Sequence, residues 1–168
     1  TYLPCMRYVG EWSTADRKKL VVLAPDVLAV FWKHRQRFFW QPESGGILLG
    51  RRRGKHLEVL LATEPSSHDK RSTYSFVREA AGHAEVAQQT WLRGECQVDY
   101  LGEWHTHPQT VPIPSGIDQT EWCKLALQRP EKTTLLTVVV GTKELRVELI
   151  DHVRHEVLES IPPAQAKW

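Results

Sequence analysis

The chain has 168 residues, of which 41% are hydrophobic and 25% charged, and its formal net charge is +2. This composition is typical of a globular protein with its own core, and so small a charge does not predict a nucleic-acid partner. No apolar run is long enough for a membrane span, and the N-terminus lacks the pattern of a secretory signal. We therefore expect one domain over residues 1–168, in the cytoplasm, with no membrane partner. The three widely spaced cysteines, Cys5, Cys96 and Cys123, predict free thiols in a reducing compartment.

The N-terminal half begins with a flank, residues 1–19, that predicts no element. Apolar residues at helical spacing predict a helix within 21–36 that begins near Pro25 and packs against a sheet. The run Glu43-Ser44-Gly45-Gly46-Ile47-Leu48-Leu49-Gly50 predicts a loop entering a buried strand, which places Glu43 at the mouth of that strand. The basic cluster Arg51-Arg52-Arg53-Gly54-Lys55 lies between two apolar runs and predicts an exposed hairpin turn with solvated arginines.

The remaining elements alternate between strands and helices. We expect a polar loop over 64–74, a helix over 75–93, a strand over 98–104, a helix over 116–128, and strands over 133–140, 145–150 and 153–158. Ser115 is expected to cap the helix after it, which places Asp118 in the first turn, where an acid is favoured. Residues 161–168 predict no element. The fold class is therefore α/β, a single mixed sheet flanked by helices.

Three side chains between residues 105 and 118 are candidate metal ligands. His105 and His107 point the same way from an extended segment, because side chains alternate along a strand. The proline-rich residues that follow end in Ser-Gly and should fold the chain back, so that Asp118 becomes the third ligand. Catalytic zinc commonly takes three protein ligands and keeps a fourth position for water. The spacing therefore predicts a site for one zinc ion with a bound water.

Glu43 is the candidate general base of this site. Catalytic zinc lowers the pKa of its bound water to about 7, and a nearby carboxylate can take the proton and pass it to a leaving amine. Trp104 and Trp122 flank the candidate ligands in sequence and are expected to shape the wall of the site. Taken singly, each of these residues could be a surface or core side chain, and only their combination predicts hydrolysis.

Two other metal motifs are incomplete in this chain. His83-Ala84-Glu85 matches half of a zinc deaminase signature, but the Cys-x-x-Cys half is missing. His155-Glu156 begins like a zincin helix, but Glu159 stands where the second histidine is required. Deamination and zincin chemistry are therefore set aside.

Glu43 before a Gly-Gly-x-Leu-x-Gly run, then His105-x-His107-Pro108, then Ser115-x-x-Asp118, resembles the JAMM motif of the JAB/MPN metalloprotease family. The resemblance implies the cytidine-deaminase-like architecture of that family and zinc bound by His105, His107 and Asp118. It also implies that Glu43 is the general base and acid. Ser115 would help to hold the water or the tetrahedral intermediate. Family members with this motif hydrolyse bonds beyond the C-terminus of ubiquitin and ubiquitin-like proteins.

The segments Ser67–Arg78 and Gly102–Pro108, together with Trp122, look like the bacterial JAB peptidases encoded in CBASS anti-phage operons. The resemblance covers about Pro25 to Ile150. It implies a peptidase that works against an activating-conjugating fusion enzyme. That enzyme joins the C-terminus of a cGAS/DncV-like nucleotidyltransferase to target amines, and the JAB peptidase would remove it.

Two alternatives remain open at this point. The same ligands could serve a JAMM peptidase that acts on another bacterial ubiquitin-like modifier or on a sulfur-carrier protein. A non-catalytic MPN scaffold is the alternative of another class, although five intact motif positions argue against it.

Overall fold

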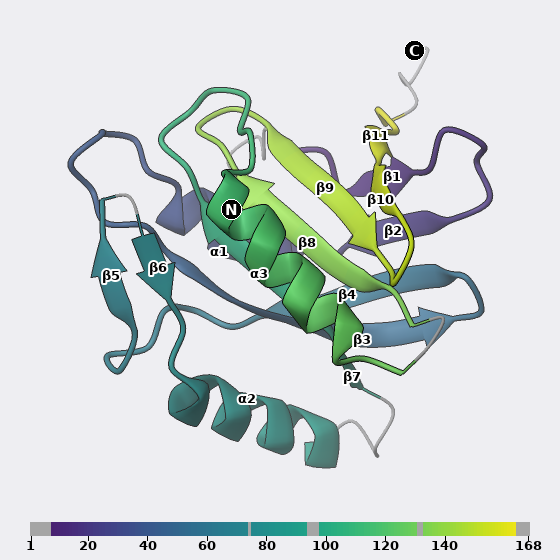
Figure 1. The fold of residues 1–168 in the computed structure, drawn as a ribbon, viewed down its shortest axis with the longest axis horizontal. Helices are drawn as coiled ribbons and strands as arrows, with labels where there is room; N and C mark the ends of the chain where they lie inside the picture. Colours follow the sequence, from purple (N-terminus) through teal and green to yellow (C-terminus); the bar gives the residue numbers. More distant parts are fainter. Residues whose placement is uncertain (1–7, 74, 94–97, 131–132, 164–168) are drawn as a thin grey trace, which may run out of the picture.

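The computed structural model describes residues 8–73, 75–93, 98–130 and 133–163. Within these ranges the centre of the molecule is a nine-stranded sheet with the order β10-β9-β8-β7-β3-β4-β2-β1-β11 (Figure 1). Its strands are β1 (Glu11–Ser13), β2 (Leu20–Leu23), β3 (Gly45–Arg53), β4 (His56–Ala62), β7 (Asp99–Thr106), β8 (Leu135–Val140), β9 (Leu145–Ile150), β10 (His155–Val157) and β11 (Glu159–Ser160). The pairs β2–β4 and β7–β8 are parallel, and the other neighbours are antiparallel. The expected mixed sheet is confirmed.

Helices cover both faces of this sheet. Helix α1 (Pro25–His34) begins at the predicted proline and buries Val27, Leu28 and Phe31 against one face. On the other face lie α2 (Ala80–Arg93) and α3 (Gly116–Leu127), the latter running along β8 and in front of it (Figure 1). The inner strand β8 is buried along its whole length, which explains its nearly continuous apolar sequence Leu-Leu-Thr-Val-Val-Val. The fold is thus a three-layer α/β arrangement.

A small second sheet stands beside the large one and is formed by β5 (Lys70–Ser72) and β6 (Ser75–Val77). The sequence predicted a helix from residue 75, but α2 begins at Ala80, so this prediction is wrong for the first turn. Phe76 and Val77 favour a strand and find antiparallel partners in β5. The Asp69 carboxylate accepts the Glu79 N–H at 2.9 Å and so ties the end of the hairpin to its start.

The structure corrects two further expectations. The N-terminal flank contributes β1, which pairs with both β2 and β11 although it carries no strand pattern of its own. The predicted hairpin is present, with its turn at Gly54 and Lys55, but the three arginines Arg51–Arg53 form the end of β3 and not part of the turn. Gly54 has φ +62°, a left-handed conformation that glycine adopts without strain. The Arg52 guanidinium donates to the Thr134 carbonyl, so this side chain is not simply solvated.

Among the described residues, no helix is long and apolar enough to cross a membrane. Cys123 is a free, exposed thiol. Cys5 and Cys96 lie outside the described residues, so the expectation of free thiols is confirmed at Cys123 and stays a prediction for the other two.

Candidate metal centre and its cleft

The two histidines are delivered by the end of β7. His105 lies in the strand and His107 directly follows it, so both rings leave the same face of an extended segment. The His107 N–H donates to the Val140 carbonyl at 3.0 Å, which fixes the backbone to the end of β8. Both histidines are 9% exposed.

The aspartate is delivered by the first turn of α3. Ser115 is the N-cap, and its hydroxyl accepts the Asp118 N–H at 3.2 Å. The Asp118 carboxylate in turn accepts the Ser115 N–H at 2.6 Å, which completes a capping box. The predicted cap is confirmed, and it fixes the start of α3 beside the two histidines.

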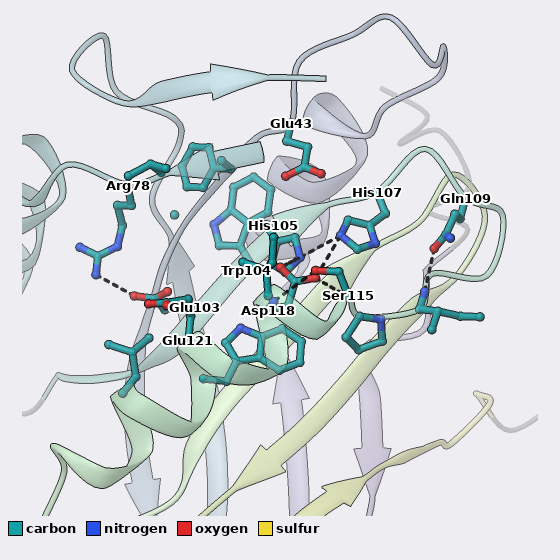
Figure 2. A pocket seen from close by; sticks show the side chains of 18 of the residues that line it. Glu43, Arg78, Glu103, Trp104, His105, His107, Gln109, Ser115, Asp118 and Glu121 are labelled. Atoms are coloured by element: carbon teal, nitrogen blue, oxygen red, sulfur yellow. Dashed lines mark hydrogen bonds and ion pairs between the residues drawn. The ribbon is translucent and has the colours of Figure 1, made fainter. Parts of the chain in front are cut away.

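The three candidate ligands converge on one point (Figure 2). The Nε2 atoms of His105 and His107 are 3.1 Å apart, and each lies 3.4 Å from an oxygen of Asp118. Ligands held at about 2.0–2.1 Å from one tetrahedral ion are separated by about 3.3–3.4 Å. Two imidazole nitrogens and one carboxylate oxygen are also the donors that zinc accepts. The residues present therefore fit a zinc ion.

Glu43 lies across the cleft from this group, and its carboxylate points toward His105, His107 and Asp118 (Figure 2). It precedes β3, whose first residue, Gly45, is the cross-strand partner of His105. A Cβ on Gly45 would lie 2.6 Å from the Phe76 ring and from the Trp104 carbonyl, so only glycine fits there. The predicted place of Glu43 at the mouth of a buried strand is confirmed.

A buried hydrogen-bond network joins the Glu43 segment to the histidine segment. Thr106, between the two histidines, accepts the Ser44 N–H at its hydroxyl, 3.0 Å away, and its own N–H donates to the Ser44 carbonyl at 2.8 Å. The same hydroxyl donates to Gln36 Oε1 at 2.9 Å. The Gln36 amide then donates to the Gln41 carbonyl at 2.8 Å. The candidate base and the candidate ligands thus share one polar framework.

Burial and neighbouring charges act on the titratable groups of the site. Burial raises the pKa of Glu43 above its ordinary value, and the charges of His105 and His107 oppose this shift only in part. Burial also raises the pKa of Asp118, but hydrogen bonds from both histidines outweigh it and hold the pKa far below the ordinary value. Asp118 is therefore a carboxylate, the form that binds a cation.

The site opens into a cleft of about 960 Å³. Trp104 and Trp122 both line it, as expected, and the Trp122 ring centroid is 5.8 Å from that of His105. An ion pair between Arg78 and Glu103, 2.7 Å long, lies at the opposite end of the cleft from Gln109 (Figure 2). The three candidate ligands and Glu43 all line this one cleft.

The incomplete deaminase motif has a structural role. His83 is 1% exposed, and its ring contacts Thr63 Oγ1 at 2.6 Å and the Asp69 carboxylate at 3.0 Å. These contacts join α2 to the end of β4 and to the residue before β5. This arrangement is consistent with the expectation that His83 takes no part in deamination, because His83 faces packed protein and not the cleft.

Comparison with known proteins decides the family. A family model described as prokaryotic homologs of the JAB domain matches residues 24–153. The chain belongs to this JAB family. A relative from Pseudomonas aeruginosa (strain BWHPSA011 / Pa011), named CD-NTase/cGAS isopeptidase, is 37% identical over 145 residues, which cover 86% of this chain and 92% of the relative. Proteins of the same name from Vibrio cholerae (strain El Tor Inaba N16961) and Escherichia coli (strain TW11681) are 35% and 34% identical over 125 residues, 74% of this chain and 78% of each relative.

A solved structure shares this fold. The solution structure of protein DSY2949 from Desulfitobacterium hafniense aligns with a TM-score of 0.61 and 23% identity, covering 84% of this chain and 91% of that one. At this identity the likeness concerns the fold alone. It supports the architecture that the JAMM-like motif implied.

Sequence reasoning missed several residues of the JAB site. Phe76 and Arg78 line the cleft, and Arg71 holds the backbone at Glu43, yet all three lie in a stretch expected to be loop and helix. Gln36 and Thr106 have no local motif either. Two signals were available: the resemblance of the Ser67–Arg78 segment to the bacterial JAB peptidases, and the position of Thr106 between two candidate ligands.

Proposed function

We propose that this JAB-family hydrolase is a zinc-dependent isopeptidase, with His105, His107 and Asp118 as the zinc ligands. The observation that carries the proposal is the convergence of these three donors opposite the Glu43 carboxylate in one open cleft. A non-catalytic scaffold would need neither the matched donor spacing nor an acid aimed at it.

The chemistry is hydrolysis of an amide bond. A bound zinc ion would act as a Lewis acid and lower the pKa of a coordinated water to about 7. Glu43 accepts a proton from the attacking water and then delivers it to the nitrogen of the leaving amine, so that acid and amine are the products. Its raised pKa suits a group that must both take up and release a proton.

Ser115 has a second role beside its cap. Its hydroxyl oxygen accepts the Asp118 N–H, so the hydroxyl hydrogen can be donated to the carbonyl oxygen as negative charge develops there. The residue lines the cleft next to Asp118, where such a donor is needed.

The substrate is a protein. The relatives from three bacteria carry the name CD-NTase/cGAS isopeptidase. By this likeness, the acyl side of the cleaved bond is the C-terminus of a cGAS/DncV-like nucleotidyltransferase joined to a target amine. The chain would thereby reverse the action of an activating-conjugating fusion enzyme in CBASS anti-phage defence.

The test is cleavage of a fusion between the cognate nucleotidyltransferase and a reporter protein, joined directly after the nucleotidyltransferase C-terminus. We expect the zinc-loaded protein to release the reporter, and matched fusions of ubiquitin and of a sulfur-carrier protein to remain intact. Cleavage of a matched fusion instead would transfer the assignment to that modifier, and cleavage of none would contradict the isopeptidase function.

The matched catalytic variant is Glu43→Gln, which keeps the shape of the side chain but cannot accept a proton. General acid–base catalysis contributes about 10²–10⁴-fold, so a loss of that size in kcat is expected with the zinc content unchanged. A variant as fast as the wild type would refute the role of Glu43.

A further inference from the structure

The β5–β6 hairpin holds the main chain of Glu43. The Glu43 N–H donates to the Ser72 carbonyl at 2.8 Å, and the Glu43 carbonyl accepts from Arg71 Nε at 2.7 Å. Both main-chain groups of the candidate base are therefore bound by two consecutive residues of β5.

The Arg71 guanidinium also reaches the residues on either side of Glu43. Its Nη2 atom donates to Ser44 Oγ at 2.6 Å and lies 3.5 Å from the Pro42 carbonyl. A guanidinium is planar and presents its donors in a rigid fork. When one guanidinium binds several acceptors, it therefore fixes the positions of those acceptors relative to one another more firmly than separate hydrogen bonds would. One side chain thus spans three consecutive residues around the base.

These contacts act on a segment without regular secondary structure. Residues 42–44 lie between α1 and β3 and belong to no helix or strand. On the far side, Ser44 is anchored to Thr106, so the segment is held between the hairpin and the strand that carries His105. The direction of the Glu43 side chain depends on both the hairpin and Thr106, because the backbone of residues 42–44 has no sheet or helix hydrogen bonds to hold it.

We propose that Arg71 is a positioning residue, whose guanidinium fixes the main chain at Glu43 so that the carboxylate stays directed at the candidate zinc ligands. This inference rests on the proposed role of Glu43. The contacts of Arg71 reach main-chain carbonyls and the Ser44 hydroxyl, so it acts through geometry. A catalytic group about 1 Å out of place can cost about 100-fold in rate.

Arg71 can be replaced without disturbing the core. It is exposed, and it lies outside the three hydrophobic clusters of the described residues. Its neighbour Lys70 is a matched control, because its side chain is 80% exposed and its partner, Glu79, is a surface residue 3.6 Å away. The two substitutions differ in contact with the Glu43 segment and not in strand or charge.

The experiment measures kcat and KM on the nucleotidyltransferase–reporter fusion for the wild type, Arg71→Met, Arg71→Lys and Lys70→Met. For Arg71→Met we expect kcat to fall about 10–100-fold, with KM, zinc content and unfolding temperature close to wild type. Arg71→Lys keeps a charged donor and should recover part of the rate, whereas Lys70→Met should behave as wild type. Wild-type kcat in Arg71→Met overturns the inference, as does a rate loss that merely follows lost zinc or lost stability.

A double-mutant cycle with Glu43→Gln separates this inference from the proposed function. If Arg71 acts only through Glu43, Arg71→Met should cause little further loss of the residual rate in the Glu43→Gln background. Full additivity of the two losses overturns the positioning role. If Glu43→Gln alone keeps the wild-type rate, the proposed function of the base fails. If Glu43→Gln is slow and Arg71→Met is fast, only the role of Arg71 fails.

Discussion

The Thr106 hydroxyl offers a quantitative test of the framework that joins the two halves of the site. Thr106 is fully buried, and its hydroxyl accepts the Ser44 N–H and donates to Gln36 Oε1. The substitution Thr106→Val keeps the shape of the side chain but removes both interactions. Ser44 and Gln36 are 2% and 1% exposed, so water cannot replace the missing partner.

The expected cost follows from the two groups left without a partner. A buried polar group that loses its hydrogen bond costs about 1–3 kcal/mol, so two such groups lower the free energy of unfolding by about 2–6 kcal/mol. For a chain of this size, 1 kcal/mol corresponds to about 2–4 °C, so the unfolding temperature should fall by at least about 4 °C.

Thr137 provides the matched control on the neighbouring strand. It is 1% exposed, and its hydroxyl has no hydrogen-bond partner among the described residues. Thr137→Val should therefore leave stability unchanged or raise it, because the buried hydroxyl is replaced by a methyl group. The assay is thermal and urea unfolding of both variants. Equal stability losses in the two, or a wild-type Thr106→Val, would refute the reasoning.

Further predictions concern the metal, the helix cap and the buried histidine. His107→Ala should lose most of its zinc in elemental analysis, and a chelator should abolish cleavage by the wild type until zinc is restored; an unchanged zinc content would contradict the ligand assignment. Ser115→Ala should lower the free energy of unfolding by about 0.5–2 kcal/mol through loss of the cap, and Ser115→Thr should not. Equal denaturation midpoints for these two variants would count against the cap. His83→Ala removes a partner from the buried Asp69 and should cost about 1–3 kcal/mol in urea unfolding, whereas exposed His68→Ala should cost little. Matching losses at both histidines would argue against a special role for His83.

Short-range patterns made the α3 region predictable from sequence. Ser115, Asp118 and the residues after them signal a capped helix within a few positions, and the structure contains that cap. The close pair His105 and His107 likewise follows from alternation along one strand. The two histidines lie near Glu43 because β3 pairs with β7. Local spacing could not predict this pairing, whereas the resemblance to a known motif implied that Glu43 and the histidines share one site. The roles of these residues, and the single domain over 1–168, stay predictions.

Long-range pairing explains what sequence reasoning missed. Strand β1 is three residues long, and its partners come from β2 and from the distant β11. The β5 strand is polar and exposed, so its sequence has no apolar alternation that would predict its pairing with β6. Arg71 lies in the Ser67–Arg78 segment that resembles the bacterial JAB peptidases, but no local pattern indicates its role, because its acceptors lie 27 and 28 positions earlier in the chain.

The turn at Gly54 and Lys55 has a practical consequence. Glu43 precedes one end of β3 and this turn follows the other, so nine strand residues, at about 3.3 Å each, separate them by about 30 Å. The glycine there has open space around it. A fluorophore, an affinity handle or a tether to a surface could be inserted at this hairpin tip while the hydrolytic end stays free to work. Single-molecule observation of the cleavage event would then need no change to either terminus.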